Sequence, residues 1–514
     1  MSKALLKSTG VVSSMTFISR VLGFIRDMVY AQLFGVGAGT DAFFVAFRIP
    51  NFLRRLFAEG AFSQAFVPVF SEYKTQRSHA ELQELVDQVA GTLGLILFAV
   101  TAIGVFAAPL LVWIFAPGFT ADQTKYELTV EMLRITFPYL LFISLTAFAG
   151  GVLNSCGRFA VPALTPVLLN ICMIIAAVWV SPLMDRPVLG LAWGVFVAGL
   201  TQLLFQIPYL KELKLLPRPR WGWHAEGVRR VLKLMLPALF GSSVAQINLL
   251  FDTLLASFLA TGSVSWLYYS DRLVEFPLGM FGVALGTVIL PSLSLKHASA
   301  STEGFSRTLD WALRWALLVG IPATVALTIL GGPILSALFQ HGEFGADDVR
   351  MATKSLMAFA MGLAAFMLIK VLAPGFYARQ DTRTPVRIGI IAMLSNMVFN
   401  VILIFPLAHA GLALATSLSA FLNAGLLFHH LRRDGHYRPT AGWRRFLVRI
   451  GLANVLMGVV LWFGAGDLST WLEASTRARL FHLSWLVVLG AAAYLVGILA
   501  VGVRPRHLKV VTDI

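Results

Sequence analysis

Residues 91–115 read GTLGLILFAVTAIGVFAAPLLVWIF and contain no charged side chain. A helix that crosses the hydrocarbon core of a bilayer needs about 20 mainly apolar residues, so this stretch alone is long enough. Windows of the same kind recur along almost the whole 514-residue chain and leave little sequence for water-soluble domains. We therefore expect an all-α polytopic membrane protein, because a helix satisfies its own backbone hydrogen bonds in lipid.

The apolar windows predict about fourteen transmembrane helices when each must have the length of a span. We place them near residues 11–35, 41–70, 85–115, 128–155, 161–183, 189–210, 231–259, 264–293, 309–340, 350–377, 385–407, 410–431, 445–465 and 480–503. The first window has lysines before it, as a secretory signal would, but Arg20 interrupts its apolar stretch. We interpret it as a retained helix rather than a cleaved signal.

The overall composition supports a membrane protein, with 57% hydrophobic and 13% charged residues. The formal net charge is +15, but the basic residues sit in short segments between apolar runs, so no basic domain remains to bind nucleic acid. Two cysteines, Cys156 and Cys172, lack CxxC spacing and indicate neither a disulfide framework nor a zinc site.

Lys and Arg favour alternate loops, which is typical of the cytoplasmic side of a membrane protein. The segment from Lys211 to Arg230 is rich in them, whereas the loops at 35–39, 260–263 and 341–348 carry almost none. We therefore expect both termini in the cytoplasm. The basic residues that do not fit this pattern are Lys125, Arg186, Arg477 and Arg479.

The longest polar connection, residues 210–233, divides the chain into halves that echo each other. Gly39 precedes Pro68 by the same 29 residues by which Gly262 precedes Pro291. Such an echo is typical of duplicated transporters. We predict an N-lobe at 1–213, a cytoplasmic linker at 214–226, a C-lobe at 227–435, each lobe with six helices, and two additional helices at 436–514.

Charged residues inside the predicted spans are the most informative feature for function. An arginine at the centre of a spanning helix costs about 2.5–3.5 kcal/mol on insertion scales, so it must face water, an acidic partner or an anion. We expect Arg20, Arg26, Arg54 and Arg272 to bind an anionic substrate, because guanidinium grips phosphate or carboxylate with paired hydrogen bonds. Interfacial positions or structural ion pairs explain Asp27, Arg48, Arg55 and Glu59.

Two acidic residues are expected to partner these arginines. Glu275 lies three residues after Arg272 and so shares its helical face, where it can hold the guanidinium until an anionic substrate competes. Asp41, at the outer start of the second span, is expected to pair with an arginine when an outer gate closes.

A sodium-type cation site is predicted from Asp252, Asn396, Asn400 and Thr416. Asp252 is a carboxylate in the apolar stretch NLLFDTLLASF, which has no basic residue. Asn396 and Asn400 share one helical face, and Thr416 adds a hydroxyl. One carboxylate with neutral oxygens suits a hard cation better than a transition metal. Interhelical hydrogen bonding explains the same Asn and Thr residues equally well.

Four stretches resemble the MurJ (MviN) lipid II flippases, and the likeness runs over essentially the whole chain. They are VVSSMTFISRVLGFIRD at 11–27, GTDAFFVAFRIPNFLRRLFAEGAFSQAFVPVFSEY at 39–73, SVSWLYYSDRLVEFPLGMFGVALGTVILPSLS at 263–294 and KVLAPGFYARQDTRTPVRI at 370–388. That family belongs to the multidrug/oligosaccharidyl-lipid/polysaccharide exporter superfamily. The resemblance implies two lobes around a central cavity, with the two additional helices forming a groove for a lipid tail.

The resemblance also implies function and site. It predicts a transporter, not an enzyme, that flips the cell-wall precursor lipid II from the cytoplasmic to the periplasmic leaflet of the inner membrane. Its partners are lipid II, membrane lipid and, as candidates, cell-wall synthesis proteins. The family's cationic cavity residues match Arg20, Arg26, Arg54 and Arg272, with Asp41 and Glu275 as acidic partners. No cofactor is expected apart from the candidate sodium ion.

Three other functions stay open at this point. An exporter of another polyprenyl-pyrophosphate-linked oligosaccharide has the same physical requirements. A multidrug/cation antiporter shares the fold, but an acidic cavity suits cationic drugs better than an arginine-rich one. A membrane glycosyltransferase or polymerase acts on the same substrate, but it usually needs a catalytic carboxylate in a sizeable outer loop, and the outer loops predicted here are mostly short.

Overall fold

The structure is a computed structural model that describes residues 3–55, 62–299 and 301–503, with side chains described except at 3–9, 237–245 and 281–288. Helices and turns make up these ranges, and no β-strand occurs in them. The expected all-α architecture is therefore confirmed. Glu59, for which an interfacial or structural role is predicted, lies outside the described residues.

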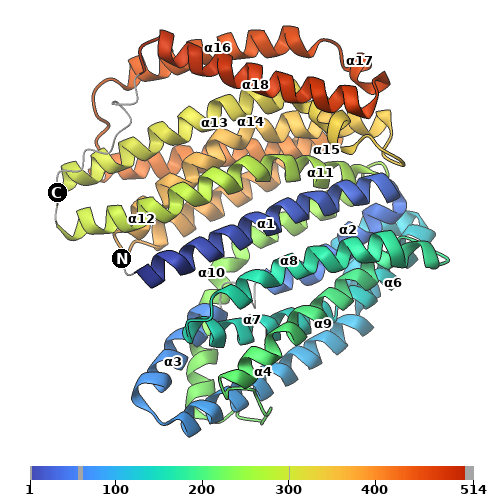
Figure 1. Ribbon diagram of the computed structural model, residues 1–514, viewed down its shortest axis with the longest axis vertical. Coiled ribbons are helices and arrows are strands. Elements are labelled where there is room, and N and C mark those ends of the chain that lie inside the picture. Colours follow the sequence, from blue (N-terminus) through green and yellow to red (C-terminus); the bar gives the residue numbers. More distant parts are fainter. Residues whose placement is uncertain (1–2, 56–61, 300, 504–514) are drawn as a thin grey trace. The chain divides into compact units, whose positions relative to one another are not determined.

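The chain divides into two compact units, residues 1–265 and 266–514, which are described separately (Figure 1). This division rests on contacts within the chain. The predicted six-helix lobes with a linker at 214–226 are a different partition and stay a prediction.

Unit 1 is built from ten helices and the start of an eleventh. They are α1 Lys3–Phe34, α2 Ala38–Arg54, α3 Phe62–Gln76, α4 His79–Phe106, α5 Ala108–Phe115, α6 Gln123–Thr136, α7 Tyr139–Ser155, α8 Ala160–Ile175, α9 Leu189–Glu212, α10 Glu226–Ser257 and the beginning of α11 Ser263–Pro277. Helix α1 packs on α8, α2 packs on α6, and α7 and α8 both pack on α9. These contacts surround the polar residues described below.

The rest of α11 and the remaining helices form unit 2. They are α12 Val283–Ala298, α13 Thr302–Phe339, α14 Ala346–Tyr377, α15 Arg383–Arg433, α16 Trp443–Ala465, α17 Leu468–Glu473 and α18 Thr476–Ala500. Helix α14 packs between α13 and α15, while α16 and α18 pair with each other and with α13 (Figure 1). The apolar contact of this pair with α13 includes Leu330, Leu461 and Leu486, all buried.

Within the described residues, the predicted spans fall mainly on helical segments, and these helices contain two local breaks. The opening stretch 91–115 is interrupted at Ala107, the residue between α4 and α5, where Pro109 enters the first turn of α5. Helix α15 leaves helical geometry at Ala408, with φ 49° and ψ −130°, between the spans predicted at 385–407 and 410–431. Nine helical segments of the described residues are long and apolar enough to cross a membrane. The total of fourteen crossings stays a prediction.

The polar connection between α9 and α10 is held firmly against α4. Buried Asp87 accepts a hydrogen bond from the backbone N–H of Arg218 through its carboxylate at 2.7 Å, and from that of Arg220 through its carbonyl at 3.0 Å. The backbone N–H of Gly222 donates to Thr92 Oγ1 at 3.1 Å. Gly91 allows this close approach, since a Cβ there would lie 2.2 Å from the Arg220 carbonyl oxygen.

Three of the basic residues that do not fit the loop pattern have acceptors in the structure. Arg479 is buried and donates to the carbonyl oxygens of Trp471 at 2.7 Å, Leu472 at 2.8 Å and Gln340 at 3.0 Å, which ties the start of α18 to α13. Arg186 lies 3.4 Å from Glu131 on the surface, and Lys125 forms the buried pair described below. Nearby acceptor groups therefore explain the positions of these three basic residues, which the loop pattern does not predict.

Candidate functional site

Helix α1 carries two of the four predicted substrate arginines, Arg20 and Arg26. Arg26 Nη2 lies 2.7 Å from Asp27 Oδ1, and both side chains are almost fully buried. Its Nη1 donates to Asn170 Oδ1 on α8 at 3.1 Å. Asn170 in turn donates to the Ser19 carbonyl at 3.0 Å, so Arg26 helps to fasten α1 to α8. Arg20, on the same helix, is exposed.

Asp27 lies in a structural ion pair of the kind predicted for it, and Arg48 has a hydrogen-bond contact. Asp27 is the buried partner of Arg26. Arg48 on α2 donates to Thr253 Oγ1 on α10 at 2.6 Å. Asp27 therefore neutralises a buried charge, and Arg48 connects α2 to α10.

Asp41, near the start of α2, is the centre of a buried polar cluster. Its Oδ2 lies 2.9 Å from Lys125 Nζ and accepts the backbone N–H of Gly262 at 2.7 Å. Its Oδ1 accepts the backbone N–H of Ser265 at 3.0 Å and the Ser265 hydroxyl at 2.7 Å. A carboxylate that accepts the first N–H groups of a helix stabilises its N-terminus, so Asp41 joins α2 and α6 to the beginning of α11. The cation beside Asp41 is Lys125, not the arginine that we expected.

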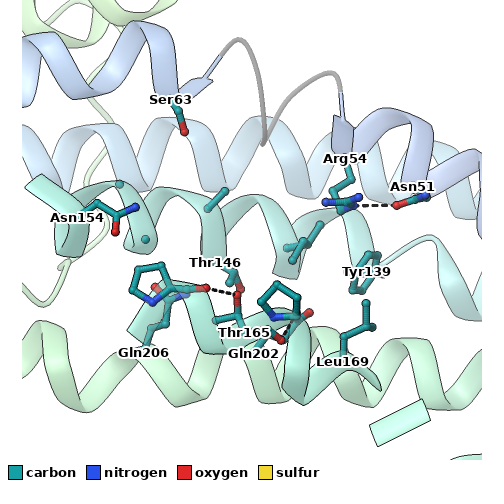
Figure 2. A pocket seen from close by; sticks show the side chains of 16 residues that line it. Asn51, Arg54, Ser63, Tyr139, Thr146, Asn154, Thr165, Leu169, Gln202 and Gln206 are labelled. Carbon is teal, nitrogen blue, oxygen red and sulfur yellow. Dashed lines mark hydrogen bonds between the residues drawn. The ribbon is translucent and has the colours of Figure 1, made fainter. Parts of the chain in front are cut away.

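Arg54, the last residue of α2, lines a pocket of about 420 Å³ within unit 1 (Figure 2). Its Nε donates to Asn51 Oδ1 at 2.8 Å, one turn earlier. Helices α7, α8 and α9 supply most of the remaining wall. The polar residues that line it besides Arg54 are Asn51, Ser63, Tyr139, Thr146, Asn154, Thr165, Gln202 and Gln206.

A proline within α8 gives rise to the polar groups in the pocket wall that α8 and α9 form. Pro166 has no N–H to donate to the carbonyl of Pro162, and the Thr165 hydroxyl donates to that carbonyl instead, at 2.8 Å. The Thr165 carbonyl then accepts from Gln202 Nε2 at 2.8 Å. Gln202 and Gln206 lie one turn apart on α9, and both are 1% exposed.

In unit 2, Arg272 and Glu275 form the ion pair that their spacing suggests, with Nη1 and Oε2 2.9 Å apart. The Arg272 guanidinium also lies 5.2 Å from the ring centroid of Tyr268. Both side chains of the pair are about two-fifths exposed, so solvent screens the attraction. The roles of Arg272 and Glu275 toward a substrate stay a prediction.

Three of the four predicted cation ligands come together in unit 2. Asn400 Nδ2 donates to Asn396 Oδ1 at 2.8 Å, and Asn396 Nδ2 lies 3.4 Å from Thr416 Oγ1. Asp252 belongs to α10 in unit 1, so the four-residue site stays a prediction. The described residues contain no group of three or more His, Cys, Asp or Glu side chains arranged to hold a metal ion.

Sequence reasoning missed Lys125 and the two glutamines of α9 as parts of these clusters. Lys125 had a signal, since it is a cation in a loop where cations were not expected. Gln202 and Gln206 are neutral, and a single amide in an apolar helix is more often interhelical hydrogen-bond glue than a binding group.

Comparison with known proteins identifies the family of the chain. Residues 30–481 match the family described as "Lipid II flippase MurJ". The "Probable lipid II flippase MurJ" of Vibrio cholerae is 51% identical over 100% of this chain and 99% of its own length. The "Lipid II flippase MurJ" of Burkholderia cenocepacia is 44% identical over 94% of this chain and 95% of its own.

Solved structures give the same result at the level of the fold. A "Lipid II flippase MurJ, inward closed conformation" has a TM-score of 0.80 at 28% identity and covers 95% of this chain and 97% of its own. An inward-facing multidrug resistance MATE transporter of the MOP superfamily has a TM-score of 0.68 at 15% identity, covering 85% and 99%, and so shares the fold alone. The match of residues 30–481 and the 51% identity over the full length show that the chain belongs to the MurJ family of lipid II flippases.

Proposed function

We propose that this chain flips lipid II from the cytoplasmic to the periplasmic leaflet by alternating access, and that Arg20, Arg26, Arg54 and Arg272 line a central cavity and bind its pyrophosphate or peptide carboxylates. Membership of the MurJ family supports the substrate. The observation that carries the proposal for the site is Arg54 at the wall of a polar pocket inside a membrane helix bundle. A fixed guanidinium in such a place attracts an anionic head group.

Arg54 gives a sharper test of substrate binding than Arg26. Removing Arg26 leaves the buried carboxylate of Asp27 without a cation 2.7 Å away, so a loss of function has a structural explanation as well. Arg54 lines a pocket, so its loss changes the charge that the pocket presents to a head group.

The test is lipid II flipping by purified protein in proteoliposomes. Arg54→Ala is expected to lose flipping while the protein still inserts, and Arg54→Lys to recover only part of it, because lysine lacks the planar fork. Arg350→Ala is the matched control, since it removes an exposed arginine paired with Asp347 in unit 2. Normal flipping by Arg54→Ala would refute the assignment.

For the gate, we assign the buried cluster of Asp41, Lys125 and the start of α11. The five donor and acceptor groups link helices that are far apart in sequence, and alternating access requires contacts of this kind that form and break. Asp41→Asn is expected to reduce flipping, whereas lipid II binding measured in detergent should survive. Loss of binding together with flipping would place Asp41 in the binding site instead.

The proposed orientation has both termini in the cytoplasm. Reporter fusions at Gly37, Lys214, Gly345 and the C-terminus test it, with cytoplasmic signals expected at Lys214 and the C-terminus. A periplasmic C-terminus would contradict it.

A sodium ion bound by Asp252, Asn396, Asn400 and Thr416 is proposed as part of the energy source. The proximity of the last three side chains supports it, although Asn396 Oδ1 already accepts a hydrogen bond from Asn400. The membrane potential alone is the rival, at about 2.3 kcal/mol per charge per 100 mV. Flipping measured with sodium replaced by potassium at fixed potential, alongside Asp252→Ala, separates them. Unchanged flipping in both tests leaves the potential as the driving force.

A further inference from the structure

The pocket beside Arg54 is lined by two acceptor groups that the described residues of unit 1 do not use. Gln202 Oε1 and Gln206 Oε1 are buried and have no hydrogen-bond partner within the described residues. Burying a carbonyl oxygen without a donor is unfavourable, and most such oxygens in proteins have a partner. An unsatisfied acceptor in the wall of a pocket therefore indicates that something in the pocket supplies an N–H or O–H group.

The identity of the Gln202 acceptor follows from its surroundings. The two ends of a glutamine amide are easily confused, but here the Thr165 carbonyl lies 2.8 Å from one of them. A carbonyl oxygen can only accept, so the NH₂ end of Gln202 must face it. The other end is then an oxygen, and it can only accept a hydrogen bond from a ligand.

The opposite wall has the complementary chemistry. The guanidinium of Arg54 can only donate, and Asn51 receives its Nε–H at 2.8 Å. Figure 2 shows Arg54 and Asn51 on α2 across the pocket from Thr165, Gln202 and Gln206. The pocket thus offers acceptors on α9 and a fixed positive charge on α2.

The pocket has the size of a small-molecule site. Its volume of about 420 Å³ lies toward the lower end of the roughly 300–1,000 Å³ that is usual for ligand pockets. The glycines Gly150 and Gly151 on α7 keep one wall flat, and a Cβ at Gly150 would lie 3.3 Å from Pro162. One sugar-sized or dipeptide-sized group fits, whereas a complete lipid-linked head group does not.

We infer that this pocket is a subsite for a secondary amide of the substrate head group, with the amide N–H donated to Gln202 and Gln206 and a nearby anionic group facing Arg54. This rests on the proposed function and specifies the part of the substrate that unit 1 holds. A secondary amide is supplied either by the acetamido groups of the sugars or by the attached peptide. Both donate an N–H and carry an adjacent carbonyl that can accept from the side-chain NH₂ of Asn51, whose Oδ1 receives the Arg54 Nε–H.

The experiment measures binding of three short-tailed lipid ligands to the full-length protein in detergent. The first is lipid II, the second has the acetamido nitrogens of its sugars N-methylated, which removes the N–H and keeps the acetyl carbonyl, and the third lacks the peptide. Each is titrated against wild type, Gln202→Leu, Gln206→Leu and the control Gln246→Leu. Gln246 also has a buried amide oxygen without a partner among the described residues, but it does not line the pocket.

The expected result is a ratio of affinities measured on one protein, so that incomplete folding of a variant does not affect it. Wild type and Gln246→Leu are expected to bind lipid II about 5- to 10-fold more tightly than one of the two altered ligands, which corresponds to about one hydrogen bond. In Gln202→Leu and Gln206→Leu this preference should fall toward 1. If the variants lose the preference against the N-methylated ligand, the sugar supplies the amide; if they lose it against the peptide-free ligand, the peptide supplies it.

Other outcomes overturn the inference, and they distinguish failure of the subsite from failure of the proposed function. If wild type binds all three ligands equally, the glutamine oxygens are satisfied by water alone and the subsite is refuted while the proposed function stands. If Gln202→Leu and Gln206→Leu keep the full preference for lipid II, a different site recognises the amide and the subsite is refuted. If wild type binds none of the three, the proposed function fails and this inference fails with it.

Discussion

Replacing Lys125 by Met is expected to destabilise unit 1 strongly, because it leaves the Asp41 carboxylate buried without a cation. The two side chains are 5% and 1% exposed, and their charged atoms lie 2.9 Å apart. Removing one partner of a buried ion pair costs about 3–5 kcal/mol. Gly262 and Ser265 still donate to Asp41, which places the expected loss near the lower end, at about 3 kcal/mol. The substitution also removes a cation–π contact, because Lys125 Nζ lies 4.1 Å from the ring centroid of Phe119.

The assay is reversible unfolding of the purified chain in mixed micelles, with Lys125→Met compared with Arg186→Met. Arg186 lies 3.4 Å from Glu131 in an exposed pair, and such pairs contribute about 0–1 kcal/mol. The double variant Asp41→Asn/Lys125→Met is expected to be more stable than Lys125→Met, because Asn carries no charge and still accepts from Ser265. If Lys125→Met unfolds like Arg186→Met, or if the double variant is no more stable than the single one, the buried charge does not hold this cluster together.

Two further predictions concern the connections between helices. Gly91→Ala is expected to detach the segment after α9 from α4, since the new Cβ would lie 2.2 Å from the Arg220 carbonyl oxygen. Trypsin should then cut this segment faster than in wild type. The control is Gly94→Ala, where a Cβ meets nothing within 4 Å. Unchanged cleavage would show that the segment is not held by this contact. Tyr437→Phe removes a hydrogen bond to buried Asp310 and should cost about 1.5–3 kcal/mol at neutral pH. Burial raises the pKa of the Tyr437 phenol above its usual value of 10.0. The stabilisation by this hydrogen bond is therefore complete below pH 10.0 and declines as the pH rises further. A difference in stability between wild type and Tyr437→Phe that does not change with pH would contradict this prediction.

The helices were predictable from the sequence because each apolar window has one low-energy form in lipid. The interruption at Ala107 was not, since the residues on both sides of it are equally apolar and the apolar pattern does not register a local break. The non-helical backbone at Ala408, in contrast, falls in the short gap left between two predicted spans. Hydropathy therefore predicts where helices lie better than it predicts how they bend.

The sequence predicted only those residues of the candidate site whose charge is energetically costly inside a membrane span. Arg54 and Asp41 are costly inside spans, and both lie at polar sites in unit 1. The partner of Asp41 could not be deduced, because Lys125 is 84 residues away in the chain and the choice between a lysine and an arginine depends on tertiary packing. Gln202 and Gln206 carry no charge, so their placement in the pocket wall required the structure.

Transport of lipid II across the inner membrane is tested most directly by the leaflet distribution of lipid II in cells depleted of the protein. We expect lipid II to accumulate on the cytoplasmic leaflet, wild-type protein to restore its export, and Arg54→Ala not to restore it. An unchanged periplasmic share of lipid II after depletion, in cells without another flippase, would contradict it.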